Sequence, residues 1–233
     1  MRAAELMDLE PAACFLIDVD GAEPLIAVER YDRVMPEHEI ADAVDGLPAP
    51  FRLHQEDMCQ AIGLSSGLKY EPSAANYLNH MADVLRRELT LFNEDRLMLS
   101  YYQLFDYLVG NCDNHLKNWS MLWDKDWRIK RLAPLYDVVD TTLYPNLVRE
   151  MGVSFGGSRR IDDVGRADVL QRLASCGVAH QIAGFMVSDM VKETSDALEA
   201  AAARLVEEGF PAAERVLKQM LPGVRERAKR IAG

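Results

Sequence analysis

The sequence predicts a mostly helical α+β fold with two short β-hairpins. Two apolar runs within residues 13–29 flank the turn-forming pair Asp20-Gly21, which predicts one hairpin near the start of the chain. Within residues 119–132, two strand-like runs are joined by a short polar turn, which predicts the second hairpin. Beyond residue 166 the chain is rich in alanine and broken only by glycine and proline, which indicates helices.

The remaining elements follow from capping residues and breakers. Residues 1–10 have the character of a helix that ends before Pro11, and residues 34–51, with three prolines and a glycine, predict a loop. The pattern turns helical at His54, where nearby acidic residues suit a helix N-terminus, and Gly63 predicts the end of that helix. Further helices are expected over residues 74–88 after a Ser73 cap, from Asp95 to Gly110, and over residues 166–175, 179–206 and 211–231.

Composition excludes several classes of protein. With 233 residues, 49% of them hydrophobic, the chain is long enough for one ordinary domain or two small ones. A net charge of −11 argues against direct nucleic-acid binding, although it leaves nucleotide binding open because a metal ion can supply positive charge. Apolar runs are too short to span a membrane, and the first residues resemble no signal or transit sequence. Four widely spaced cysteines favour neither disulfides nor zinc, so we expect a cytoplasmic protein.

The chemically informative segment is a polar loop at residues 111–118, NCDNHLKN, between a predicted helix and the second hairpin. Within it, Asp113 and Asn118 are five positions apart, and Asp137 follows just beyond the hairpin. Protein kinases take a catalytic base and one magnesium ligand from a D-x-x-x-x-N loop, and a second ligand from a later Asp. The order therefore indicates phosphoryl transfer, with Asp113 as the base and Asn118 and Asp137 as magnesium ligands.

Two other interpretations of the same residues stay open. The D-x-x-x-x-N spacing alone also occurs by chance, in which case Asp113 and Asn114 would cap a turn, His115 would be a buried interface residue and Asp137 an ordinary loop acid. A metal-dependent hydrolase using Asp113, His115 and Asp137 is a weaker alternative, because such sites usually group more ligands. Lys117 lies near the same centre, where it could neutralise a phosphate oxygen.

Four segments along the chain resemble one known family. They are AVERYDR (27–33), RLHQEDMCQAIGLSSGLKYE (52–71), LVGNCDNHLKNWSML (108–122) and RLAPLYDVVDT (131–141). In this order they resemble the HipA family, which comprises serine/threonine kinases of bacterial toxin–antitoxin systems and their relatives. The resemblance covers residues 1 to about 160, and the helical tail is similar to the family only in general character. It implies a kinase-like C-terminal lobe, with residues 1–33 as an interlobe hairpin and hinge, and residues 34–233 as a helical lobe that contains the catalytic loop 111–118.

The resemblance also implies roles for single residues, with ATP and magnesium as cofactors. Asp113 matches the family's catalytic aspartate, and Asn118 and Asp137 match its magnesium ligands. Residues expected to line the phosphate side of the nucleotide site are His115, Leu116, Lys117, Asn118 and Tyr136. Residues expected near the adenine, mainly through backbone groups, are Glu29, Arg30 and Tyr31, with Asp32 near the ribose. The segment around Gln55, Glu56 and Asp57 is family-like without an assignable chemical role, and we expect it to pack against the polar loop.

One departure from the family affects the functional prediction. Family kinases carry an N-terminal lobe with a glycine-rich phosphate loop, a phosphate-binding lysine and a regulatory serine, whereas no lysine or glycine precedes residue 13 here. The sequence is thus expected to be a truncated chain, one half of a split kinase, or a degenerate member.

Two functional hypotheses follow. The first is the C-terminal lobe of a serine/threonine kinase toxin that acts on translation, with a protein substrate such as an aminoacyl-tRNA synthetase. The second is a non-catalytic module that binds a helix-turn-helix antitoxin or a separate N-lobe chain. The complete set of Asp113, Asn118 and Asp137 favours the first hypothesis, and the missing phosphate loop favours the second.

Overall fold

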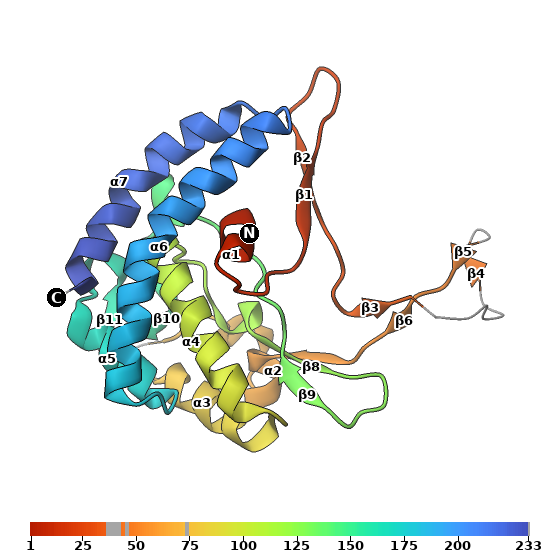
Figure 1. The fold of residues 1–233 in the computed structure, drawn as a ribbon. Helices are drawn as coiled ribbons and strands as arrows, with labels where there is room; N and C mark the ends of the chain where they lie inside the picture. The colour runs from red at the N-terminus through yellow and green to blue at the C-terminus, as the bar shows by residue number, and fades with distance from the viewer. Residues whose placement is uncertain (36–42, 45–46, 73–74, 233) are drawn as a thin grey trace.

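The computed structural model describes residues 1–35, 43–44, 47–72 and 75–232, and it has the mostly helical α+β architecture that the sequence predicts (Figure 1). Two long antiparallel helices arch over one side of the body, and a hairpin and a thin extension project from the other. No helix of the described residues is long and apolar enough to cross a membrane. The helices are α1 (Arg2–Leu6), α2 (Met58–Ile62), α3 (Tyr77–Glu88), α4 (Phe92–Val109), α5 (Arg166–Ser175), α6 (His180–Glu207) and α7 (Ala212–Ala232).

Both predicted hairpins are confirmed. The first pairs β1 (Cys14–Ile17) with β2 (Leu25–Val28), and the second pairs β8 (Ser120–Trp123) with β9 (Lys130–Leu132), both antiparallel. The second hairpin also gains a strand that the sequence did not predict, because β7 (Gln55–Asp57) pairs with the other edge of β8. The helix expected from His54 was therefore placed too early: residues 55–57 complete a sheet, and α2 begins only at Met58.

Three further strand pairs lie in segments for which no strand was expected. A third hairpin joins β10 (Glu150–Phe155) to β11 (Ser158–Arg160). Its turn needs Gly156, whose φ is +61° and whose missing Cβ would lie 2.6 Å from the backbone of Asp168. The predicted loop at residues 34–51 contains two short pairs, β3 (Arg33–Val34) with β6 (Phe51–Arg52) and β4 (Ala43–Val44) with β5 (Leu47–Pro48). Residues 36–42 and 45–46 of that loop, including Pro36 and Gly46, lie outside the described residues.

The observed end of α2 matches the prediction made from a glycine. The observed starts of α3 and α4 differ from the starts that were predicted from Ser73 and Asp95. Gly63 ends α2 in the left-handed conformation, as predicted. The proposed Ser73 cap lies outside the described residues, and α3 begins at Tyr77. The helix expected to start at Asp95 begins earlier, at Phe92. Asp95 lies in its first turn, where it is buried and accepts a 2.8 Å hydrogen bond from Arg131.

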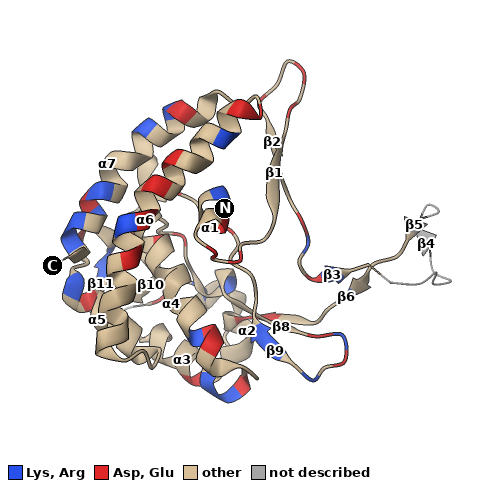
Figure 2. Cartoon of the chain, viewed as in Figure 1, with Lys and Arg blue, Asp and Glu red and all other residues tan. Residues whose placement is uncertain are grey.

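Helix α4 lies at the centre of the core and delivers the chain to the polar loop. Its buried face includes Leu104, Phe105 and Leu108, and it packs against α6, α7 and β9. It ends at Gly110 with φ +92°, where a Cβ would lie 2.5 Å from a carboxylate oxygen of Asp140. Charged residues are spread along α6 and α7, whereas strands β1 and β2 carry none (Figure 2). The fold thus combines a charged helical exterior with a projecting hairpin whose two strands carry no charge.

Candidate active site

The polar loop is held by elements that are distant in the sequence. The Asn111 amide donates to the buried carboxylate of Asp106 in α4 (2.8 Å). The Cys112 N–H donates to the Thr141 hydroxyl (2.8 Å), and the Cys112 carbonyl accepts from the Gly152 N–H in β10 (2.8 Å). Because three elements hold two consecutive loop residues, the residue that follows, Asp113, emerges from a fixed backbone.

Gly152 lets β10 lie directly against this loop. A Cβ at this position would approach the backbone nitrogen of His115 to 2.6 Å, so any larger residue would displace the loop. No local signal in the sequence marks this glycine, because its neighbours in space are far away in the chain.

Asp113 and Asn118 come together as the D-x-x-x-x-N spacing predicts. The Asn118 side-chain amide donates to the main-chain carbonyl of Asp113 (2.9 Å), which closes the loop on itself. The Asp113 side chain is exposed, and its Oδ1 accepts a hydrogen bond from the Tyr70 hydroxyl (2.6 Å). An exposed carboxylate on a fixed loop is what a general base requires.

Asp137 lies next to the end of the same loop. The neighbouring Tyr136 hydroxyl donates to the Lys117 carbonyl (2.7 Å) and shares a 2.6 Å hydrogen bond with the Ser120 hydroxyl. Asp137 itself is exposed and adopts a left-handed φ of +57°. The Tyr136 hydroxyl thus ties the segment that carries Asp137 to Lys117, the residue before Asn118.

The donor types fit magnesium. Mg²⁺ prefers hard oxygen ligands and usually takes one or two from the protein, with water and phosphates supplying the others. Asp137 and Asn118 supply one carboxylate and one amide oxygen. Within the described ranges, no three His, Cys, Asp or Glu side chains gather into a ready-made metal site. The chemistry of this donor set therefore suits a metal held jointly by protein and nucleotide.

The three remaining loop residues expected near the nucleotide have other partners. His115 is buried and its Nε2 lies 2.7 Å from the Lys69 ammonium, and burial, followed by this charge, lowers the pKa of His115. Leu116 is fully buried in the core. The Lys117 ammonium binds the Asp57 carboxylate at 2.5 Å, and this hydrogen bond raises the pKa of Lys117. The charge of Lys117 is therefore already paired.

The segment expected to form the hinge contacts Tyr136 through Tyr31. Its ring lies 5.7 Å from that of Tyr136, centroid to centroid, and burial raises the pKa of Tyr31 to about 12. Asp32 is buried, and Arg30 binds both of its oxygens (2.8 and 2.7 Å). Hydrogen bonding to Arg30 is the main reason why the pKa of Asp32 falls to about 2. Asp32 is therefore already paired with an arginine in this structure.

Glu29 and Arg30 are exposed at the end of the first hairpin. The Glu29 N–H is already used, because it donates to the Ala13 carbonyl (2.8 Å).

Several residues at the site were not singled out from the sequence. They include Lys69 and Tyr70 of the family-like segment 52–71, and Asp57 of the same segment, which was named without a chemical role, packs against the polar loop as expected. The contacts of this segment with the loop are Asp57 with Lys117, Lys69 with His115, and Tyr70 with Asp113. The available signal was the family-like character of that segment, which does not identify the side chains that reach the loop.

Asp106 was also missed, because it lies in the interior of a predicted helix. It is 3% exposed, and burial raises its pKa to about 7, with a smaller contribution from the charge of Asp137.

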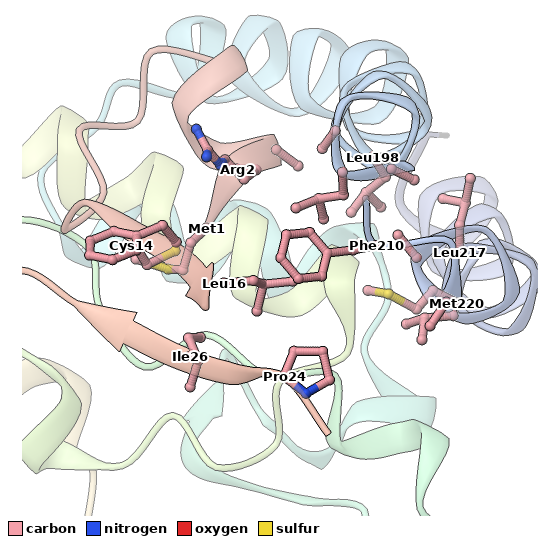
Figure 3. A pocket seen from close by; sticks show the side chains of 18 of the residues that line it. Met1, Arg2, Cys14, Leu16, Pro24, Ile26, Leu198, Phe210, Leu217 and Met220 are labelled. Atoms are coloured by element: carbon pink, nitrogen blue, oxygen red, sulfur yellow. The ribbon is translucent and has the colours of Figure 1, made fainter. Parts of the chain in front are cut away.

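An apolar cavity of about 510 Å³ is lined in part by Phe105 and Val109 of α4. It is enclosed by β1, β2, α1 and the α6–α7 corner, and Figure 3 shows side chains of all these elements around it. It contains none of the predicted catalytic residues but extends to Val138, the residue after Asp137. Prominent apolar side chains around it are Leu16, Ile26, Leu198, Phe210, Leu217 and Met220.

Comparison with known proteins gives consistent matches. Residues 1–202 match the family model described as the HipA-like C-terminal domain. Y4mE of Sinorhizobium fredii, a protein named as a kinase, is 32% identical over 199 residues, which cover 85% of this chain and 44% of Y4mE. The serine/threonine-protein kinase toxin HipA of Shewanella oneidensis is 26% identical over 168 residues, covering 66% of this chain and 35% of that toxin.

A solved structure shares the fold. The complex of HipA, HipB and operator DNA from Shewanella oneidensis contains a chain that aligns with a TM-score of 0.77 at 19% identity. The alignment covers 100% of this chain and 56% of that one. The chain therefore spans about half the length of the relatives it matches, or less.

Proposed function

Because the chain belongs to the HipA-like C-terminal domain family, we propose that it is the catalytic C-terminal lobe of an ATP-dependent protein serine/threonine kinase. The observation that supports the proposal is the local geometry of the polar loop. The Asn118 amide donates to the Asp113 carbonyl, the Asp113 side chain is exposed, and Tyr136, the residue before Asp137, donates to the Lys117 carbonyl. Residues 1–33 would form the interlobe hairpin and hinge, and residues 34–233 the helical lobe.

In this proposal, Asp113 accepts the proton of the attacking protein hydroxyl as that oxygen bonds to the γ-phosphorus of ATP and ADP leaves. Asn118 and Asp137 would hold magnesium, which when bound offsets the charge that builds up on the phosphate oxygens. Tyr31 and Tyr136 would form the wall between the hinge and the phosphates, since their rings are already in contact.

The partners follow from the relatives. The Shewanella oneidensis HipA structure contains HipB and operator DNA, and the HipA toxin of that organism is a named serine/threonine kinase. We therefore propose an antitoxin partner of the helix-turn-helix type and a protein substrate in translation, such as an aminoacyl-tRNA synthetase.

The first hairpin offers a surface for a partner, which a second candidate function, a module that binds a partner without catalysis, would also need. Phe15 and Leu25 on one face are 50% and 58% exposed, and Ile26 on the opposite, cavity-side face is 67% exposed. Strands that are apolar on both faces are typical of sheets covered on both sides. A complementary N-lobe chain would cover these strands, and this docking would serve a kinase and a non-catalytic module equally.

The test compares wild-type protein with Asp113→Asn, a nearly isosteric change. Each would be assayed alone and with an N-terminal lobe from a relative such as Y4mE, by following labelled γ-phosphate from ATP into protein of a bacterial translation extract. We expect weak transfer alone, because these 233 residues carry no glycine-rich loop and lysine ahead of the hairpin. With the lobe, Asp113→Asn should lower the rate by about a hundredfold or more, the scale of positioned acid–base groups.

Transfer by the Asn variant at the wild-type rate would remove Asp113 from the role of base. Tight binding of the N-terminal lobe without any transfer would favour the non-catalytic module. Strong transfer by the 233 residues alone would show that the phosphate site needs no second lobe.

A further inference from the structure

The segment at residues 68–71 crosses the polar loop and is fixed to it and to the third hairpin. The Lys69 carbonyl accepts a hydrogen bond from the Leu116 N–H in the loop (3.1 Å). The Glu71 N–H donates to the Gly152 carbonyl in β10 (2.8 Å). The loop is thus bridged to β10 through this segment, and the residue between the two anchors is Tyr70.

A buried carboxylate strengthens the second anchor. Glu71 is 5% exposed, and its two oxygens accept hydrogen bonds from the N–H groups of Tyr77 (2.9 Å) and Ser154 (2.6 Å). The Tyr77 hydroxyl in turn donates to the Leu68 carbonyl (2.8 Å). The backbone around Tyr70 therefore has little freedom.

The Tyr70 side chain lies over the loop among three neighbours. Its hydroxyl is 2.6 Å from Oδ1 of Asp113. Its ring makes an edge contact with the His115 imidazole, with centroids 5.1 Å apart, and the Lys69 ammonium lies 4.9 Å from the ring centroid. In the part of the chain that the structure describes, no other side chain donates to the Asp113 carboxylate.

From this geometry we infer that Tyr70 is a positioning residue, which fixes the orientation of the Asp113 carboxylate through Oδ1 and leaves Oδ2 to accept the proton of the substrate hydroxyl. The inference rests on the proposed function, in which Asp113 is the base. An exposed carboxylate without a partner would rotate freely, and misorientation of a catalytic group lowers the rate even when the fold is intact. A rigid phenol on an anchored backbone removes that freedom.

The kinetic test is Tyr70→Phe, which removes the hydroxyl and keeps the ring against His115 and Lys69. With the N-terminal lobe present, kcat should fall about tenfold, the effect of losing one hydrogen bond to a charged group, while KM for ATP stays unchanged. The matched control is Tyr144→Phe, because Tyr144 is 58% exposed and its hydroxyl makes no hydrogen bond within the described residues. A kcat equal to that of the control would overturn the inference. A lower KM for the protein substrate with kcat retained would also overturn it, because Tyr70 would then be blocking the acceptor site.

A second measurement does not depend on activity. Hydrogen bonding to Asp113, with burial second, raises the pKa of Tyr70 to about 12. The titratable groups that face its ring are Asp113, His115 and Lys69. The tyrosines can be titrated with pH by carbon NMR in tyrosine-labelled protein, and the Tyr70 signal can be assigned through Tyr70→Phe. Tyr70 should keep its phenol proton at pH values well above the ordinary tyrosine pKa of about 10. In Asp113→Asn it should titrate close to that ordinary value.

An ordinary pKa for Tyr70 in the wild-type protein would overturn the inference whatever the kinetics show. Absence of transfer by the wild-type protein with its lobe would count against the proposed function instead, and the titration would still decide whether Tyr70 holds Asp113.

Discussion

Asp57 links the start of α2 to the polar loop, and its two oxygens have separate tasks. Oδ1 accepts the N–H of Gln60 (3.0 Å), and the Gln60 side chain accepts the N–H of Asp57 (3.0 Å), which forms a capping box. Oδ2 binds the Lys117 ammonium. Two substitutions can separate these contributions, because asparagine caps a helix as well as aspartate does but carries no charge.

The structure gives a magnitude for each change. In Asp57→Ala the lost cap should cost about 1 kcal/mol of unfolding free energy. The lost ion pair should cost about 0.5 kcal/mol, since the Lys117 side chain is 38% exposed and such pairs are screened by water. Asp57→Ala should therefore destabilise the protein by about 1.5 kcal/mol, and Asp57→Asn by about 0.5 kcal/mol.

Urea unfolding followed by circular dichroism would measure both, with an unchanged m-value as the sign that only stability has changed. Asp83→Asn is the control, since Asp83 forms an exposed pair with Arg86 within α3 and should shift stability by no more than about 0.5 kcal/mol. Equal losses in Asp57→Ala and Asp57→Asn would refute the reasoning, because the cap would then contribute nothing.

Two more predictions concern acids near the site. Asp137→Ala, in the protein with its N-terminal lobe, should weaken magnesium-dependent ATP binding in calorimetry and leave metal-free adenosine binding unchanged, because the metal contacts only the phosphates; equal loss of both would make Asp137 structural. Asp106 should make stability fall as pH rises from about 4 to about 7, because its folded pKa of about 7 lies above the unfolded value of 3.8 and the folded state then holds the extra proton. In Asp106→Asn, the slope of unfolding free energy against pH should be smaller by as much as about 1.4 kcal/mol per pH unit. Identical pH profiles for the variant and the wild type in thermal unfolding would contradict the prediction that Asp106 is buried in its neutral form.

The helical tail could be predicted from the sequence because its signals are local. Gly177 and Gly209 both have positive φ, and they separate α5 from α6 and α6 from α7, within a residue or two of the expected boundaries. A breaker acts on its own backbone, so no knowledge of the rest of the fold is needed. The polar loop was predictable for a similar reason, since its residues are consecutive.

The short strands depend on partners that the sequence does not reveal. Residues 55–57 form β7 only because β8, more than sixty positions away, offers a free edge (Gln55 lies opposite Leu122). Three residues are too few to show an alternating pattern. The contact between Tyr70 and Asp113 spans 43 positions and likewise leaves no local signal.

The tail that resembles the family least contributes directly to the geometry of the loop. The family match ends at residue 202, yet Arg227 in α7 is 4% exposed and donates to the Leu108 carbonyl at the end of α4 (2.9 Å). That carbonyl belongs to the last turn of the helix, where no backbone N–H is available within the helix itself. The residue that caps α4 thus lies outside the recognisable family region. Since α4 sets where the polar loop begins, the candidate active site is a product of the whole chain rather than of the family motifs alone.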